Sequence, residues 1–356
     1  MSFFNKDRLT AIEAKQEAQR IAFGPFIFQA SKALRDLGIL EAIESSGDNG
    51  LTISEIQDKV KLSGYGIRVL VEAGLGIGLL ILKEDKFIIT RTGYFILHDS
   101  MTRANMDFVH DVNYKGFYHL QDSIVQGKPV GLRELDSKSS TIYEALATLP
   151  EKVKESWFNF DHFYSDYSFK QVLPIIFKEP VKSIMDVGAN TGKWTLECTA
   201  YSPEVHVTMC DLQGQLDVAL KNVKKHGVSE RVSAHAINIL DKNTKLPTGH
   251  DVIWMSQFLD CFSEEEIVMI LKKAAAVMDS GTKLYILETY WDKQKYENAS
   301  FCLQQTSLYF TCMANGNSQM YHSSIMHKCI EEAGLKVAEE IDNIGISHTL
   351  TKCIKR

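Results

Sequence analysis

The spacing of apolar residues along the first hundred positions predicts helices followed by a hairpin. From about residue 9 to 100, apolar side chains recur every three or four positions, with a break at Gly38 that is typical of a helix end. Thr52 is followed three residues later by Glu55, the signature of a capped helix start. Two apolar runs then flank the polar turn Lys83–Lys86, which predicts a β-hairpin. Three helices and a hairpin are the order of a winged helix.

The pattern changes twice beyond this stretch. Residues 106–180 are helical in spacing and rich in aromatic side chains, and from about residue 181 strand and helix patterns alternate. Such alternation implies parallel strands joined by crossover helices, so we expect an α/β sheet with its ligand at the carboxyl ends of the strands. The predicted strands are Val181–Val187, Val205–Leu212, Val232–Ile237, Asp251–Gln257, Lys283–Thr289, Lys336–Asp342 and His348–Ile354.

Charge and composition exclude several classes of function. The 356 residues carry 39 basic and 45 acidic side chains, and residues 1–105 carry 13 of each, so we expect no nucleic-acid partner for the winged helix. No apolar run reaches the roughly 18 residues that span a bilayer, and no secretion signal stands at the start. The seven cysteines show no metal-ligand spacing. We therefore expect a cytoplasmic, metal-free protein with reduced thiols and no membrane partner.

The first strand of the α/β part ends in a loop that suits a cofactor. The segment DVGANTG, which begins at Asp186, puts Gly188 and Gly192 between a strand and a helix, where backbone N–H groups meet a polar ligand. The middle glycine of a dinucleotide loop is missing, so close approach of a pyrophosphate is not favoured. Asp186 suits instead the ammonium group of S-adenosylmethionine.

Polar residues at the ends of the next strands extend this site. Asp211 lies 25 residues beyond Asp186, where a carboxylate accepts both hydroxyls of a ribose. Asn238 follows the third strand and offers its side-chain carbonyl to the adenine amino group. The alternative is that Asp186 and Asp211 are only turn residues. The other residues that we expect at the cofactor are Leu212, Ile239 and Ser256.

Taken together, these motifs resemble the class I S-adenosylmethionine-dependent O-methyltransferases. That family includes plant caffeic acid and flavonoid enzymes, the hydroxyindole enzyme and bacterial antibiotic-tailoring members. The resemblance covers nearly the whole chain, from ALRDLGILEAIESSG through FYHLQDSIVQGKPVG to DVGANTG. It implies a winged-helix-like dimerisation domain at 1–105, a helical connector at 106–180 that borders the acceptor pocket, and a Rossmann-like cofactor domain at 181–356. It also implies a homodimer that methylates a small aromatic hydroxyl compound.

The resemblance weakens at the catalytic positions. Relatives that methylate a phenol use a His after the fourth strand as base, oriented by two glutamates. In this sequence Asp260 stands at the position of that His, Glu288 matches the first glutamate, and Met320 stands at the second. Burial beside Glu288 would raise the pKa of Asp260 and make it a better base. The alternative is that Asp260 caps the following helix, a role that Ser263 fills better.

The sequence alone leaves several interpretations of the acceptor pocket and of the reaction open. His110, Phe158, His162 and His322 lie in segments that line or border the acceptor pocket in the family, and each of the histidines suits acid–base work near neutral pH. Surface or core placement is the competing interpretation for each of them. Loss of the usual base also leaves room for carbon or nitrogen methylation, or for hydroxylation or decarboxylation without methyl transfer. A third hypothesis is a ligand-sensing regulator.

Overall fold

The computed structural model describes residues 3–146 and 148–356, which form two compact units. The first ends at Val109 and the second runs from His110 to Arg356. Within the described residues, no helix combines the length and the apolar character needed to cross a membrane. The three-part division at 105 and 180 stays a prediction.

The first unit is a set of helices with one small hairpin. Its core joins α2, α3, α4, α5, the hairpin and α6, with Leu34, Ile43 and Ile67 fully buried. The predicted capped start is confirmed, because the Thr52 hydroxyl accepts the Glu55 N–H while Glu55 bonds back to Thr52. The elements are α1 Ala11–Ala22, α2 Gly24–Asp36, α3 Ile39–Glu44, α4 Ile53–Val60, α5 Gly64–Ile77, β1 Leu80–Lys83, β2 Lys86–Ile89, α6 Arg91–His98 and α7 Ser100–Asp107.

The predicted hairpin is confirmed, and its turn has the expected chemistry. β1 and β2 pair antiparallel, and Lys83 stands opposite Lys86. Between them Glu84 and Asp85 both have positive φ, 49° and 60°, as a two-residue turn that follows the twist of the strands requires. The structure therefore has the helix and hairpin order of a winged helix.

The second unit begins with helices and continues as an α/β domain. The long helix α10 carries the aromatic stretch that the sequence indicated, and it holds Pro174 in its last turns. Its helices are α8 Leu120–Gln126, α9 Ile142–Ala145, α10 Glu151–Ile176, α11 Lys193–Tyr201, α12 Gln213–Lys225, α13 Glu264–Val277, α14 Glu297–Tyr309 and α15 Ser323–Glu332. Short 3-10 or π turns cover Phe108–Asn113, Gly116–His119, Val130–Glu134, Ser229–Arg231, Leu259–Cys261, Trp291–Lys293 and Phe310–Ala314.

All seven predicted strands are present and form one sheet in the order β5-β4-β3-β6-β7-β9-β8. The five strands from β5 to β7 are parallel, while β9 runs antiparallel to both β7 and β8. This confirms the mostly parallel Rossmann-like sheet. The strands are β3 Ser183–Val187, β4 His206–Asp211, β5 Val232–Ala236, β6 Val252–Ser256, β7 Lys283–Glu288, β8 Leu335–Ile344 and β9 His348–Lys355.

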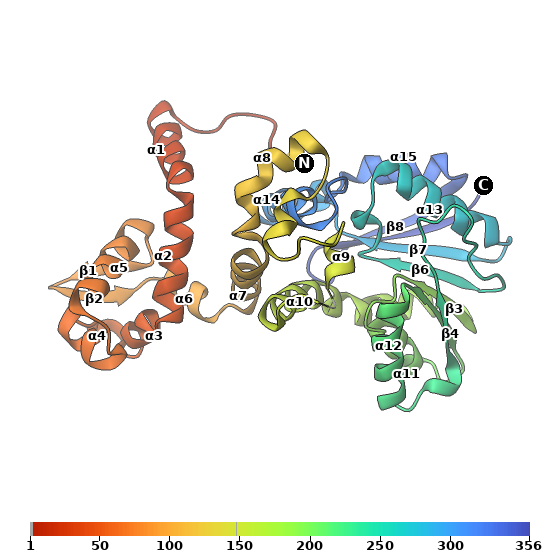
Figure 1. Cartoon of the computed structure of the whole chain (residues 1–356), viewed down its shortest axis with the longest axis horizontal. Coiled ribbons are helices and arrows are strands. Elements are labelled where there is room, and N and C mark those ends of the chain that lie inside the picture. Colours follow the sequence, from red (N-terminus) through yellow and green to blue (C-terminus); the bar gives the residue numbers. More distant parts are fainter. Residues whose placement is uncertain (1–2, 147) are drawn as a thin grey trace. The chain divides into compact units, whose positions relative to one another are not determined.

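Helices cover both faces of this sheet (Figure 1). One face packs against α13 and α15, and the other packs against α10 and α11. On the second face Trp194 of α11 stacks on Trp254 of β6, with ring centroids 4.1 Å apart. Because β3 and β6 are neighbours at the centre of the sheet, the loops that follow them lie side by side at its carboxyl edge.

Candidate functional site

The loop after β3 is shaped by two glycines. Gly188 and Gly192 both have φ of +79°, a conformation that side chains other than glycine rarely adopt. A Cβ atom at Gly188 would lie 2.4 Å from the ring of Phe258, which follows β6. The missing side chain at Gly188 therefore lets the loop after β6 pack directly on the loop after β3.

Asp211 at the end of β4 is tied to the same loop. Its Oδ2 accepts the backbone N–H of Asn190 at 2.8 Å, and its Oδ1 accepts the N–H of Leu212 at 2.7 Å. A carboxylate accepts about four hydrogen bonds, so each oxygen keeps capacity for a ribose hydroxyl. Leu212 is 41% exposed beside it, an apolar surface that a base can cover. Both residues thus lie where the sequence placed them.

Asp186 differs from Asp211 in that it is closed off from solvent. Its side chain is 2% exposed, and Oδ2 accepts the hydroxyl of Thr195 at 2.7 Å. Burial raises the pKa of Asp186 to about 7, and the nearby Asp211 charge adds to the effect. Its expected contact with an ammonium group stays a prediction.

The charge around the loop indicates which kind of cofactor fits. Asp161 of α10 joins Asp186 and Asp211, because its Oδ2 accepts the Asn190 amide nitrogen at 3.3 Å. The carboxylates of Asp161 and Asp211 repel a pyrophosphate and attract a cation, and Asp186 adds negative charge as it ionises near pH 7. The residues present therefore fit a cofactor with cationic groups and a ribose, such as S-adenosylmethionine.

The other residues predicted at the cofactor lie at the neighbouring strand ends. Asn238 is exposed, and its Oδ1 accepts the N–H of Leu240 at 3.0 Å, which leaves one lone pair. Ile239 is 7% exposed and belongs to the core beside α13. Ser256 is the last residue of β6. Their contacts with adenine and the cofactor stay predictions.

The turn after β6 is held by Glu288 at the end of β7. Gln257 takes the left-handed conformation, with φ of 46°, and bends the chain away from the sheet. Glu288 Oε1 then accepts the backbone N–H groups of Phe258 at 2.9 Å and Leu259 at 2.8 Å. The next residue, Asp260, is therefore placed by a carboxylate from the neighbouring strand.

Asp260 and Glu288 form a buried acidic pair, as the sequence indicated. They are 6% and 1% exposed, and Glu288 Oε2 is buried without a hydrogen-bond partner in the described part of the chain. The Cys261 thiol donates to Asp260 Oδ1 at 3.4 Å. Burial raises the pKa of Asp260 to about 6, while burial and the Asp260 charge raise the pKa of Glu288 further above its usual range. Each carboxyl therefore keeps its proton to higher pH than an exposed carboxyl would.

Asp260 is not the cap of the following helix. The N-cap of α13 is Ser263, whose hydroxyl accepts the Glu266 N–H at 3.3 Å while Glu266 bonds back to the Ser263 N–H at 2.9 Å. The alternative role for Asp260 is therefore wrong. The buried Asp260 carboxylate therefore does not cap the N-terminus of α13.

Three aromatic side chains near Asp260 were missed at the sequence level. Burial raises the pKa values of Tyr143 of α9 and Tyr309 of α14. The negative charge of the nearby Asp260 raises both pKa values further. Trp157 of α10 donates its Nε1–H to the Tyr309 hydroxyl at 2.7 Å. Helical spacing alone does not show which of many aromatics face the sheet edge. The one available signal was the position of Trp157 beside Phe158.

The predicted acceptor-pocket residues lie on several elements. Phe158 and His162 stack on α10, with ring centroids 5.9 Å apart. His110 bonds through Nδ1 to Asp111 at 2.8 Å. His322 is the N-cap of α15, where its Nδ1 accepts the Ser324 N–H at 3.1 Å. Whether they line the acceptor pocket stays a prediction.

Met320, at the position of the second glutamate, also contacts this end of the sheet. Its sulfur accepts the hydroxyl of Thr289, which directly follows Glu288, at 3.4 Å. A thioether is a weak acceptor and carries no charge. It therefore orients no base, and it leaves Glu288 as the acidic partner of Asp260.

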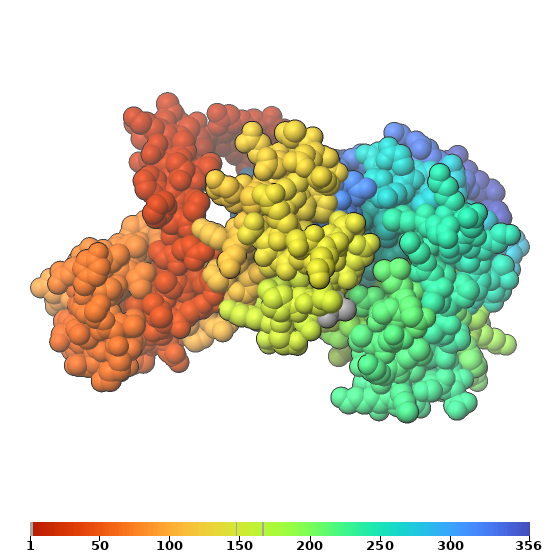
Figure 2. Space-filling view, in the orientation of Figure 1, coloured from red at the N-terminus to blue at the C-terminus, as the bar shows by residue number. Residues whose placement is uncertain are grey.

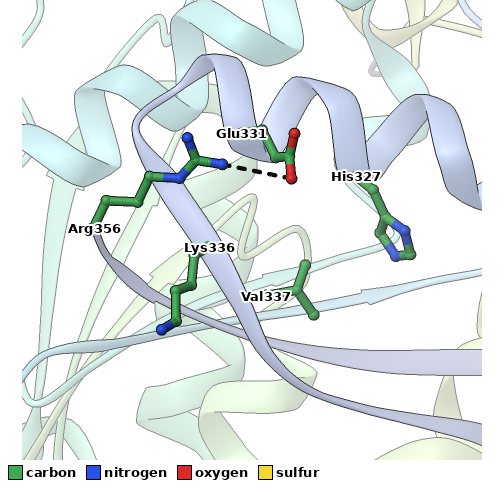
Figure 3. Close-up of a pocket in the computed structure, with 5 residues that line it drawn as sticks. All are labelled: His327, Glu331, Lys336, Val337 and Arg356. Carbon is green, nitrogen blue, oxygen red and sulfur yellow. Dashed lines mark ion pairs between the residues drawn. The ribbon is translucent and has the colours of Figure 1, made fainter.

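A separate cavity of about 360 Å³ lies between α15 and β8 (Figure 3). The close-up shows Arg356 and Glu331 facing each other, joined by an ion pair of 3.5 Å. None of the residues predicted at the cofactor or acceptor lines it. Its lining residues are His327, Glu331, Lys336, Val337 and Arg356.

Comparison with known proteins assigns a family model to each part of the chain. A dimerisation2-like domain matches residues 15–87, and an O-methyltransferase domain matches residues 117–336. The chain is 19% identical to an L-tyrosine C(3)-methyltransferase of Streptomyces lavendulae over 88% of this chain and 85% of that protein. It is 22% identical to a 3-hydroxy-5-methyl-1-naphthoate 3-O-methyltransferase of Streptomyces sahachiroi over 77% of each.

A solved structure has the same fold. The apo form of the S-adenosylmethionine-dependent methyltransferase SibL superposes with a TM-score of 0.71 at 22% identity, over 94% of this chain and 98% of that chain. This likeness shows the shared fold, and the O-methyltransferase domain matched over residues 117–336 confirms the resemblance drawn from the sequence motifs.

The raised pKa of Asp186 makes stability depend on pH in a defined direction. The folded state keeps a proton up to about pH 7 that the unfolded chain releases near its ordinary value of 3.8, so stability falls as the pH rises through this window. Asp186→Asn removes this loss. We expect its free energy of unfolding, relative to wild type, to increase from pH 4 to pH 8 by on the order of 2–4 kcal/mol.

Urea unfolding followed by the fluorescence of the stacked Trp194 and Trp254 measures this difference. Asp251→Asn is the control, because hydrogen bonds from Lys182 and Ser183 hold the pKa of Asp251 below its usual range. This variant should show a nearly pH-independent difference between pH 4 and pH 8, because Asp251 titrates below its ordinary value of 3.8. A pH-independent difference for Asp186→Asn would contradict the prediction.

Proposed function

This chain belongs to the O-methyltransferase family, and we propose that it transfers the methyl group of S-adenosylmethionine to the hydroxyl oxygen of a small aromatic compound. The observation that carries the proposal is the buried pair Asp260 and Glu288, held beside the loop 186–192 by the packing of Phe258 on Gly188. This arrangement puts a base next to the cofactor loop. S-adenosylmethionine supplies an electrophilic methyl group when bound.

The residues of the loop divide the work of holding the cofactor. Asp211 accepts the ribose hydroxyls through the lone pairs that its two backbone bonds leave. Leu212 and Ile239 cover the adenine, and Asn238 accepts from its amino group. The carboxylates of Asp186 and Asp161 favour the cationic methionine end over any anionic group.

Asp260 accepts the proton of the acceptor hydroxyl. An exposed aspartate, with a pKa near ~3.9, is a poor base for a phenol with a pKa near ~10. Burial narrows this gap by raising the pKa of Asp260 to about 6. Placement of the acceptor oxygen in line with the methyl–sulfur bond supplies the remaining rate enhancement.

An aromatic acceptor is favoured by the side chains around Asp260. Tyr309 and Tyr143 lie close enough to Asp260 to interact with its charge, and Trp157 bonds to Tyr309. Planar rings pack on one another in stacked or edge-to-face geometry. The two curated relatives are named for methylation of a naphthoate and of L-tyrosine. Phe158 and His162 extend the aromatic wall along α10.

Methylation of a ring carbon is the second candidate function. Asp260 replaces the usual His, and one of the relatives is named for methylation at C(3) of tyrosine. Deprotonation of a phenol activates the neighbouring ring carbon as well as the oxygen, so the same base serves both reactions. The two reactions differ only in whether the phenol oxygen or the ring carbon lies in line with the methyl group.

Methyl transfer can be tested with S-adenosylmethionine labelled with ¹³C in the methyl group and a panel of catechol, 4-nitrocatechol, 3-hydroxy-1-naphthoate and L-tyrosine. We expect a product whose labelled methyl is bonded to oxygen in the NMR spectrum. A label bonded to ring carbon would favour the second candidate. Consumption of acceptor without any label would indicate the non-methylating chemistry.

The first unit supports a homodimer. Helix α1 has no buried residue, and its apolar side chains Ile12 and Ile21 are 73% and 72% exposed, with Phe26 of α2 at 71%. These helices are the red elements of the space-filling view (Figure 2). Apolar area of this kind is typical of an interface between subunits, and residues 15–87 match the dimerisation2-like domain.

The ribose contact of Asp211 can be tested by Asp211→Ala. Loss of a charged hydrogen-bond partner should weaken S-adenosylmethionine binding by about 1–3 kcal/mol in a calorimetric titration. Asp217→Ala removes the same charge from the exposed face of α12 and should leave the affinity unchanged. Equal affinity in both variants would refute the ribose role.

The role of Asp260 can be tested by Asp260→Asn, which keeps the shape and removes the base. We expect kcat to fall by about 10²-fold or more, with the affinity for S-adenosylmethionine nearly intact. Glu265→Gln on the exposed side of α13 is the control. Turnover equal to wild type would move the role of base to a histidine or to no residue at all.

The dimer is tested by light scattering on the purified chain. We expect twice the chain mass of 40.2 kDa. Ile21→Glu should shift the mass toward that of the monomer, because it places a charge in the apolar face of α1. A monomer mass for the wild-type chain would contradict the proposal.

A further inference from the structure

Tyr143 is held in place by a short helix whose other residues are fixed. Helix α9 begins after Thr141, whose hydroxyl accepts the Glu144 N–H at 3.3 Å. Ile142 and Ala145 are fully buried and anchor this helix in the protein interior. The Tyr143 side chain extends from this anchored turn, so its hydroxyl has a defined position.

The Tyr143 hydroxyl is buried and makes no hydrogen bond of good geometry to the described residues, and its hydrogen-bonding neighbour there is the thiol of Cys261, a weak partner. A buried polar group without a partner costs free energy, and most such groups in folded proteins have one. A stronger acceptor from outside the chain would therefore satisfy this hydroxyl better than the thiol does.

The surroundings of the hydroxyl identify what that partner is. Its electrostatic neighbours are Cys261, Tyr309 and Asp260, which places it at the acceptor end of the site. Two of these groups are engaged with others, since the Cys261 thiol donates to Asp260 and Tyr309 accepts from Trp157. A methyl acceptor bound beside Asp260 is the outside group that this hydroxyl would meet.

Tyr143 remains a neutral donor throughout the working pH range, because burial raises its pKa well above the ordinary value of 10.0. Asp260 beside it is ionised above about pH 6 and accepts a proton. A donor and a base thus lie together. An acceptor hydroxyl placed between them gives its proton to one and receives a hydrogen bond from the other.

We propose that the Tyr143 hydroxyl donates a hydrogen bond to the oxygen of the methyl acceptor and stabilises the phenolate that Asp260 creates. This inference rests on the proposed function. The O–H bond of the acceptor breaks as its proton passes to the Asp260 carboxylate, and the electron pair stays on the oxygen, which then forms the bond to the methyl carbon. The methyl–sulfur bond breaks, and its electrons stay on sulfur.

This assignment explains how a weak base serves a phenol. A donor aimed at the oxygen lowers the pKa of the bound phenol, as donors at a developing oxyanion do in other enzymes. Asp260 then needs to accept a proton from a more acidic group. The acceptor class is therefore a phenol or catechol whose reacting oxygen, or the oxygen next to the reacting carbon, faces Tyr143.

Tyr143→Phe tests the proposal, because it removes the hydroxyl and keeps the ring. With any panel member that wild type methylates, we expect kcat/KM to fall about 10- to 100-fold. The acidic limb of the pH profile should also move to higher pH, since the bound phenol ionises less readily. Tyr201→Phe, which changes a half-exposed tyrosine of α11, should match wild type.

A comparison of two acceptors guards against a variant that is only partly folded. The loss caused by Tyr143→Phe should be greater for catechol than for 4-nitrocatechol, because the nitro group already makes the hydroxyl acidic. This ratio is independent of the active fraction of the preparation. Equal losses for both acceptors with an unmoved pH profile, or no loss at all, would overturn the proposal. Absence of methylation by wild type would instead overturn the proposed function.

Discussion

The site depends on the two hydrogen bonds that Glu288 Oε1 accepts from the backbone of the turn after β6. These bonds fix Phe258 and Leu259, and with them the positions of two different parts of the site. The ring of Phe258 rests on Gly188 in the cofactor loop, while Asp260 follows directly in the turn. One carboxylate at the end of β7 therefore sets the distance between the cofactor loop and the base.

The same carboxylate shapes the chemistry of its neighbour. Glu288 and Asp260 are both buried, and two like charges in a poorly solvated place cannot both be ionised at low cost. The pair keeps a proton to higher pH than either group would alone. A residue that is a weak base in water becomes one that can take a proton from a phenol, and the proposed contact with Tyr143 adds a hydrogen-bond donor to the phenol oxygen.

Much of the fold was predictable because it follows from local patterns. The alternating apolar segments gave all seven strands to within a few residues, and the spacing of Thr52 and Glu55 marked a helix start that the structure has. The loop DVGANTG and Asp211 were predictable for the same reason, since parallel strands bring their carboxyl ends to one edge. Tyr143, Trp157 and Tyr309 were not, because they come from three helices separated by many residues. The pattern of a single helix does not tell which aromatic faces the site.

Every role assigned to the site requires that the loop 186–192 binds S-adenosylmethionine and not a dinucleotide. Parallel isothermal titration of the purified chain with S-adenosylmethionine, S-adenosylhomocysteine and NAD tests it most directly. The three carboxylates around the loop predict micromolar binding of the two sulfur compounds and no heat of binding with NAD. Binding of NAD alone, or of none of the three, would contradict the assignment of the loop and of the site built on it.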